Sequence, residues 1–238
     1  MRTSFLLLGA AAMVAAPATL PAQVGRVLNP RYVAEAQQQR AGLLPELGGA
    51  ETGPRAAYAQ SVGRRVAAYS GVANNAYHFT LLNSAVENAF AVPGGYVYIT
   101  RQLMVLMDDE SEMAFALGHE VGHIAANHAQ ARKSAASRNT ILGVLGAVLG
   151  AVVGGGFGDL ISQSAQYGSQ LRTLSFSREQ EYQADTLGIR YMIAAGYDPA
   201  GAPGILAALG RATALEARIQ GRDQRQTPEW ASTHPLSE

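Results

Sequence analysis

The chain has 238 residues, enough for one or two domains. Its 18 basic and 18 acidic side chains balance, so it lacks the broad positive surface on which nucleic-acid binders depend. The sequence contains no cysteine, which excludes disulfide scaffolds, thiolate metal sites and a cysteine nucleophile. Charged residues make up 15% of the chain, a low share that fits a membrane-proximal protein and an alanine-rich protein equally well.

Residues 1–22 have the composition of an export signal. Arg2 gives a positive start, an apolar stretch covers residues 5–16, and Ala18 and Ala22 are candidate cleavage positions. The apolar stretch is shorter than the roughly 20 residues that a membrane-spanning helix needs. We therefore predict a signal peptide and an exported protein, with an uncleaved membrane anchor as the alternative.

A polar segment, residues 23–57, follows the signal and is interrupted by prolines and glycines. Residues 31–41 within it are rich in glutamine and have the length of a short helix. We interpret the segment as an N-terminal arm, and residues 58–238 as the main domain.

The first elements of this domain are expected to be a helix and a small sheet. Apolar residues recur three and four positions apart over residues 55–70, which is typical of an amphipathic helix. Extended segments are expected at 77–83, 86–92 and 96–101. The last two are separated by a turn at residues 93–95, Pro-Gly-Gly.

The second half of the domain is expected to be helical. One long helix begins at a cap on Asp109 and is predicted to run to about Arg132. Another begins after Ser177 and ends at Gly196, and a final helix covers residues 204–219. The whole pattern predicts an α+β fold that is mainly helical and carries a small β-sheet.

The chemistry centres on His119-Glu120-Val121-Gly122-His123, inside the first long helix. Residues four apart share one helix face, so the two histidines can offer imidazole nitrogens to one metal ion. The H-E-x-x-H pattern is a zinc metalloprotease signature, in which the metal lowers the pKa of bound water to about 7 and the glutamate takes its proton. The alternative is a pair of surface or hydrogen-bonded buried histidines.

Two residues are candidates for a third metal ligand. His128 follows the motif without a glycine turn, so we expect it on the helix surface or beside a ligand. Glu181, in the later helix, is preferred, and Asp185 shares its helix face. Asp185 can accept a hydrogen bond from the outer N–H of a ligating histidine and so fix its tautomer. Without the upstream motif, Glu181 would read as a solvated carboxylate.

These motifs together resemble the M48 metallopeptidases. Residues 177–185, after 119–123, are similar to the zinc-binding pattern of that family, residues 88–96 to its strand beside the cleft, and residues 232–235 to its downstream histidine motif. The matches lie in family order from Gly63 to Pro235. The chain is most similar in type to exported bacterial members that act in envelope protein quality control.

The resemblance implies a zincin-like catalytic domain, with the small β-sheet bordering an active-site cleft and one Zn²⁺ per chain. The implied roles are zinc ligand for His119, His123 and Glu181, catalytic base for Glu120, and support of a ligand for Asp185. His234 would approach the active site, where it would either stabilise the oxyanion or occupy the open metal position at rest. The alternative is an exposed histidine in the tail.

The resemblance also assigns a substrate-binding strand, which comprises Asn88, Ala89, Phe90 and Ala91. An exposed strand edge offers N–H and C=O groups to which a peptide can add as a further strand. We favour substrate pairing on the resemblance alone, and the alternative is an ordinary internal strand.

Residues 140–158 are apolar and rich in glycine, and four of the glycines recur every four residues. Such spacing lines one helix face with small groups and permits close packing in membranes, but three consecutive glycines at 154–156 interrupt it. We favour a lid over the cleft or a peripheral membrane element over a transmembrane span.

We predict a zinc-dependent endopeptidase that hydrolyses peptide bonds in unfolded or misfolded cell-envelope proteins by glutamate-assisted attack of a zinc-bound water. Its expected location is the periplasm or the envelope membrane periphery of a Gram-negative-type bacterium, with no nucleic-acid partner. The first alternative is a zinc-stabilised, chaperone-like binder that holds unfolded envelope proteins without turnover. A weaker alternative is a membrane-embedded anchor protein.

Overall fold

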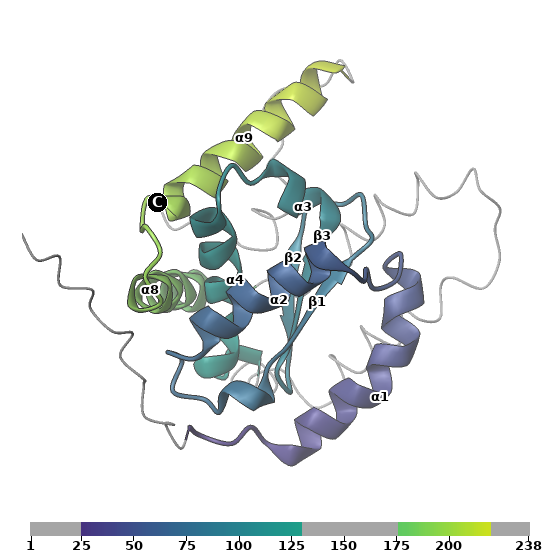
Figure 1. Ribbon diagram of the computed structural model, residues 1–238, viewed down its shortest axis with the longest axis vertical. Coiled ribbons are helices and arrows are strands. Elements are labelled where there is room, and N and C mark those ends of the chain that lie inside the picture. Colours follow the sequence, from purple (N-terminus) through teal and green to yellow (C-terminus); the bar gives the residue numbers. More distant parts are fainter. Residues whose placement is uncertain (1–24, 130–175, 220–238) are drawn as a thin grey trace, which may run out of the picture.

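The computed structural model describes residues 25–129 and 176–219 (Figure 1). The elements in chain order are α1 (Pro30–Glu46), α2 (Pro54–Ala67), the 3-10 turn η1 (Asn74–Ala76), β1 (His78–Leu82), β2 (Ala89–Val92), β3 (Tyr96–Thr100), α3 (Arg101–Leu106), α4 (Glu110–Ala125), α8 (Arg178–Ala194) and α9 (Gly201–Ile219). This confirms the predicted α+β class, mainly helical with a small sheet.

Three sequence predictions lie outside the described residues. They are the signal peptide at residues 1–22, the glycine-rich segment at residues 140–158, and His234. Among the helices in the described part of the chain, none combines the length and the apolar character that crossing a bilayer requires.

The sheet has the strand order β1-β3-β2. β1 runs parallel to β3, and β2 runs antiparallel to it, so β2 forms one edge of the sheet in the described residues. The turn predicted at residues 93–95 joins β2 to β3, with positive φ angles of 106° at Gly94 and 95° at Gly95. Glycine is required at Gly95, because a Cβ there would collide with the carbonyl oxygen of Ala76.

Helices cover both faces of this sheet. Side chains alternate between the faces, as the pleat of a strand demands. Phe79, Leu81, Val97 and Ile99 pack into the main core with α2 and α4, whereas Leu82, Tyr96 and Tyr98 pack with Ala36 of α1. The strands are therefore held between α1 on one side and the helices of the main core on the other (Figure 1).

α1 is longer than the helix predicted at residues 31–41, because its prolines do not break it. The side chain of Asn29 caps the helix and accepts a hydrogen bond of 3.0 Å from the backbone N–H of Arg31. Pro30 occupies the first turn, where no intrahelical N–H is needed. α1 lies within the segment that we interpret as an N-terminal arm, and it covers one face of the sheet.

α4 is the central helix of the described structure. Its start is fixed by Asp109, whose carboxylate accepts hydrogen bonds from the backbone N–H groups of Ser111 and Glu112. Every residue from Glu112 to Ile124 is buried, because α2, α8, α9 and the sheet all pack around the helix. A helix enclosed in this way can hold polar groups away from bulk water.

Small residues let α4 and α8 approach closely. Gly118 and Gly122 of α4 face Gly188 and Ala184 of α8. A Cβ on Gly188 would lie 2.8 Å from the backbone nitrogen of His119, and a Cβ on Gly122 would lie 3.0 Å from the carbonyl oxygen of Ala184. The backbone of α8 therefore runs directly beside the H-E-x-x-H segment.

The prediction that this helix continues to about Arg132 is wrong. α4 ends at Ala125, and Asn127 adopts a φ of 56°, the left-handed conformation that terminates helices. Asparagine enters this region more readily than other residues with a side chain. The chain therefore turns after α4 and does not extend the helix.

α8 begins and ends as the sequence predicts. The hydroxyl of Ser177 accepts a bond from the backbone N–H of Gln180, and the Gln180 side chain accepts one from the backbone N–H of Ser177. Gly196 follows the helix with a φ of 85°. α9 begins at Gly201, three residues before the predicted start.

Candidate metal centre

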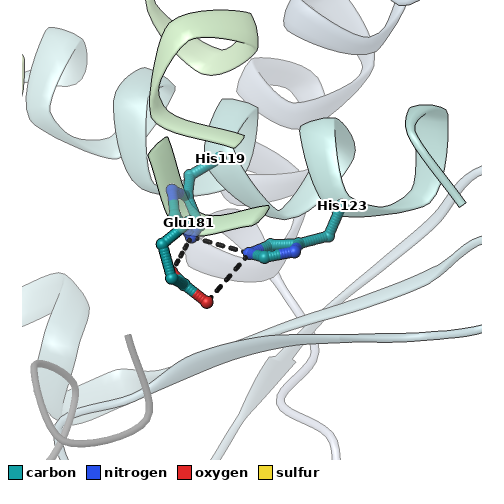
Figure 2. A group of neighbouring side chains, drawn as sticks. All are labelled: His119, His123 and Glu181. Carbon is teal, nitrogen blue, oxygen red and sulfur yellow. Dashed lines mark hydrogen bonds and ion pairs between the residues drawn. The ribbon is translucent and has the colours of Figure 1, made fainter. Parts of the chain in front are cut away.

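Three buried side chains from two helices point toward one another (Figure 2). His119 and His123 come from α4 and Glu181 comes from α8, and their side chains are between 1% and 2% exposed. The two Nε2 atoms lie 2.9 Å apart. Carboxylate oxygens of Glu181 lie 3.3 Å from His119 Nε2 and 3.7 Å from His123 Nε2. The group has the chemistry of a metal site, with all ligand atoms within 4.8 Å of one another.

Local sequence explains why these groups meet. The four-residue spacing puts both imidazoles on one face of α4. Glu181 lies one turn before Ala184, which contacts the backbone of Gly122. The close approach of the two helices therefore brings the carboxylate of Glu181 within reach of both rings.

Asp185 supports His119 from the outer side of its ring. Its Oδ1 lies 2.8 Å from His119 Nδ1, so a neutral His119 donates from Nδ1 and keeps its Nε2 lone pair for the centre. Burial lowers the pKa of His119, but hydrogen bonds to Asp185 and Glu181 and the charge of Glu120 outweigh burial and raise it to about 10. The surroundings of His119 therefore favour a positive charge at this place.

His128 lies at the outer side of His123. It is 3% exposed, so the expectation of a helix-surface position is wrong, whereas a position beside a ligand is what the structure has. Its Nδ1 lies 2.9 Å from His123 Nδ1, and its Nε2 lies 2.8 Å from Oε1 of Gln183 on α8. Burial lowers the pKa of His128, which favours the neutral ring.

Phe176 completes this side of the centre. Its ring stacks on His123 with a centroid distance of 4.0 Å and an interplanar angle of 23°. It also lies against His128, with a centroid distance of 5.9 Å. Sequence reasoning missed Phe176 and Gln183, because neither belongs to a metal-ligand spacing and both act through contacts made across the fold.

The donor set fits a zinc ion. If both histidines donate from Nδ1, two Nε2 lone pairs and a carboxylate meet in a buried space, where they repel one another unless a cation lies between them. Tetrahedral zinc with ligand distances near 2.0–2.2 Å separates its ligand atoms by about 3.3 Å. The observed spacings of 2.9, 3.3 and 3.7 Å need adjustments of only a few tenths of an ångström.

Glu120 lies between the two histidines in sequence and is 1% exposed. It follows His119 directly and is therefore offset around the helix from the face that the two rings share. Its negative charge contributes to the raised pKa of His119, which places that charge close to the centre.

The predicted substrate strand, Asn88, Ala89, Phe90 and Ala91, comprises the residue before β2 and the first three residues of β2, at the edge of the sheet. Asn88 is buried, and its backbone N–H and C=O both bond to Thr100. The other three residues belong to β2 and pair with β3. A small pocket of about 40 Å³ is lined by Ala91 of β2, Pro93, His123 and Phe176, among others.

Comparison with known proteins gives a consistent family assignment. The model of "Peptidase family M48" matches residues 54–238. The beta-barrel assembly-enhancing protease of Escherichia coli O157:H7 is 31% identical over 185 residues, which cover 76% of this chain and 36% of the relative. The mitochondrial metalloendopeptidase OMA1 of Arabidopsis thaliana is 30% identical over 145 residues, 61% of this chain and 28% of the relative.

A shorter match is to the metalloprotease LoiP of Escherichia coli K12, 33% identical over 115 residues, which cover 48% of this chain and 44% of the relative. The chain thus spans about a third of the length of the barrel assembly-enhancing proteases that it matches.

Proposed function

Because the chain belongs to peptidase family M48, we propose that it is a zinc-dependent endopeptidase that hydrolyses unfolded or misfolded proteins of the cell envelope. The observation that carries the proposal is the convergence of two imidazole nitrogens and one carboxylate in a buried centre. Such a set of three protein ligands is typical of catalytic zinc, which keeps a fourth position for water or substrate.

In this proposal His119, His123 and Glu181 hold the ion. When bound, Zn²⁺ supplies Lewis acidity, since it lowers the pKa of a coordinated water to about 7 and polarises a carbonyl oxygen. The protein supplies the rest: it fixes the ligands, orients the rings and excludes bulk water from the centre.

Glu120 is the proposed proton carrier. Its carboxylate would take a proton from the attacking water as the new C–O bond forms at the peptide carbonyl. It would then give that proton to the amide nitrogen as the C–N bond breaks, so that the leaving group departs as a neutral amine. One carboxylate can serve both steps because the proton that it receives is the proton that it returns.

The edge strand is the proposed docking site for the substrate. A peptide that pairs along Asn88, Ala89, Phe90 and Ala91 would lie extended beside His123. It would bond to the residues after Asn88, whose own N–H and C=O already bond to Thr100. Main-chain pairing requires little of side-chain identity, which suits a protease that acts on unfolded segments. His234 would act at the same place, either as an oxyanion donor or as an occupant of the open metal position at rest.

The envelope location rests on two supports. Relatives at about 30% identity are named for β-barrel assembly, and residues 1–22 have the composition of an export signal. We therefore propose export to the periplasm or the membrane periphery, with residues 140–158 as a lid or peripheral membrane element.

Replacement of the proposed base tests the function. Glu120→Gln keeps the size of the side chain but cannot take a proton, so cleavage of casein should fall by at least about 100-fold while bound zinc remains. Metal content and peptide release would be measured on the same preparation, with and without a chelator. Glu179→Gln, an exposed carboxylate of α8, is the control and should cleave like the parent.

Two outcomes would count against the proposal. Unchanged cleavage by Glu120→Gln would exclude the base. A parent protein that binds zinc and prevents aggregation of unfolded chains, yet releases no peptides, would favour the chaperone-like alternative.

A further inference from the structure

The outer side of His123 is occupied by another histidine, and this raises a question of tautomers. A neutral imidazole carries one hydrogen, and the nitrogen that carries it cannot bind a metal. His123 has Nε2 at the centre, 2.9 Å from His119 Nε2, and Nδ1 at 2.9 Å from His128 Nδ1. The Nδ1 pair needs one donor and one acceptor, so His128 decides where the hydrogen of His123 lies.

The contact with Gln183 fixes the direction of this pair. Oε1 of Gln183 can only accept, so the hydrogen of a neutral His128 lies on Nε2, at 2.8 Å from that oxygen. Nδ1 of His128 is then an acceptor, and Nδ1 of His123 must be the donor. The lone pair of His123 is left on Nε2, which faces Glu181 and His119. The hydrogen-bond direction set by Gln183 therefore leaves free the lone pair that a metal ion would need.

Packing holds His128 in this place. Its side chain is buried, and Phe176 lies against both it and His123. The amide of Gln180 donates a hydrogen bond of 3.3 Å to the backbone carbonyl of His128. α8 therefore contacts His128 through the backbone as well as through the ring.

The turn after α4 explains how a residue outside the helix reaches the centre. Had α4 continued, His128 would lie five positions after His123 and about 140° away from it around the helix. The left-handed Asn127, with a φ of 56°, instead interrupts the helix, and His128 follows this turn. Asn127 has the only positive φ of a residue other than glycine within residues 25–129 and 176–219.

We propose that His128 is a positioning residue that holds His123 as the Nδ1–H tautomer and so presents the Nε2 lone pair to the metal. This inference rests on the proposed zinc site and adds a residue that the H-E-x-x-H pattern does not contain. His128 itself touches neither metal nor substrate in this arrangement.

Two substitutions of His128 separate hydrogen bonding from packing. His128→Leu removes the acceptor and should weaken zinc binding by the full chain about 10–100-fold. His128→Asn can place its side-chain oxygen near the former Nδ1, so it should retain affinity within a few-fold of the parent. Affinity would be measured by competition with a chromophoric chelator, with zinc as the metal. Equal affinities for the parent and His128→Leu would overturn the inference.

A readout that needs no metal keeps the test decisive. In the metal-free parent, ¹⁵N chemical shifts of the imidazoles should identify His123 as the Nδ1–H tautomer, and His128→Leu should lose this preference. An Nε2–H tautomer of His123 in the parent would overturn the inference. If the parent protein binds no zinc while His123 is the Nδ1–H tautomer, the proposed function is excluded and the positioning role of His128 remains.

The turn and the glutamine provide variants outside the histidine pair. Asn127→Gly preserves access to positive φ and should keep zinc affinity, whereas Asn127→Val opposes that conformation and should lower it. Gln183→Glu keeps an acceptor and should bind zinc like the parent, whereas Gln183→Leu should weaken zinc binding about 10-fold. Equal affinity across both pairs would count against a role for His128.

Discussion

The two histidines of the centre are supported by different kinds of partner. His119 meets a half-buried carboxylate, Asp185, in one direct contact. His123 meets a buried neutral ring, His128, which in turn contacts a glutamine. Both arrangements leave a lone pair on Nε2, but one uses charge and the other uses a chain of hydrogen bonds. A charged partner strengthens the donor power of its ring, whereas a neutral one mainly fixes its orientation.

The largest expected loss of zinc affinity comes from removing Glu181, whose carboxylate lies near both histidines. Glu181→Ala deletes the only anionic ligand of the proposed set, so zinc affinity should fall by more than about 100-fold, beyond the effect typical of an outer partner. Glu179→Ala makes the same charge change at an exposed site on α8 and should leave affinity unchanged. Chelator competition on both variants measures the difference. Retained tight binding in Glu181→Ala would exclude this residue as a ligand.

The next effect separates charge from hydrogen bonding on the His119 side. Asp185→Leu removes the acceptor and should weaken zinc binding about 10–100-fold. Asp185→Asn keeps an acceptor but makes it neutral, like the partner of His123, and should lose only a few-fold. Titration of zinc into the metal-free variants would rank them. If Asp185→Asn binds zinc as weakly as Asp185→Leu, then His119 requires the negative charge of Asp185, and an acceptor that only fixes its tautomer is not enough.

The smallest expected loss of zinc affinity comes from a change in the contact between α4 and α8. Gly188→Ala puts a Cβ 2.8 Å from the backbone nitrogen of His119, so α4 and α8 must separate slightly. We expect a loss of about 1–3 kcal/mol in the free energy of unfolding, with a small parallel loss in zinc affinity. Gly210→Ala, in α9, meets no atom within 4 Å and should stabilise the protein by up to about 1 kcal/mol. Denaturant unfolding of both variants checks the contrast, and an unperturbed Gly188→Ala would contradict the close contact.

Much of the fold could be predicted because short stretches of sequence determine where its helices begin and end. The helix over residues 54–67 follows from apolar spacing, and the start and end of α8 follow from Ser177 and Gly196. The pairing of β1 with β3 in parallel could not be predicted, since it depends on which non-neighbouring strands meet. The packing of α1 on the sheet is of the same kind, because it joins segments that are remote in sequence.

The residues of the metal centre also fall into two groups, those that spacing predicts and those that depend on the fold. The sequence shows two pairs of residues four positions apart, His119 with His123 and Glu181 with Asp185. An α-helix brings the members of each pair to one face. For His128 the sequence left two positions open, on the helix surface or beside a ligand, because its position depends on where α4 ends. A left-handed asparagine leaves no periodic signal, and an unbroken helix over the same residues looks equally good in sequence. Gln183 then follows from His128 and could not be found without it.

One feature of the arrangement concerns folding more than catalysis. The stretch from Phe176 to Asp185 carries the proposed ligand Glu181 and contacts the rings of His119 and His123 through Asp185 and Phe176. It meets α4 from a remote part of the chain. An ion held between α4 and α8 would therefore close a long loop, as a covalent crosslink does. The ion proposed to activate water would also hold α8 against the core, so ion loss and loosening of α8 would be one event.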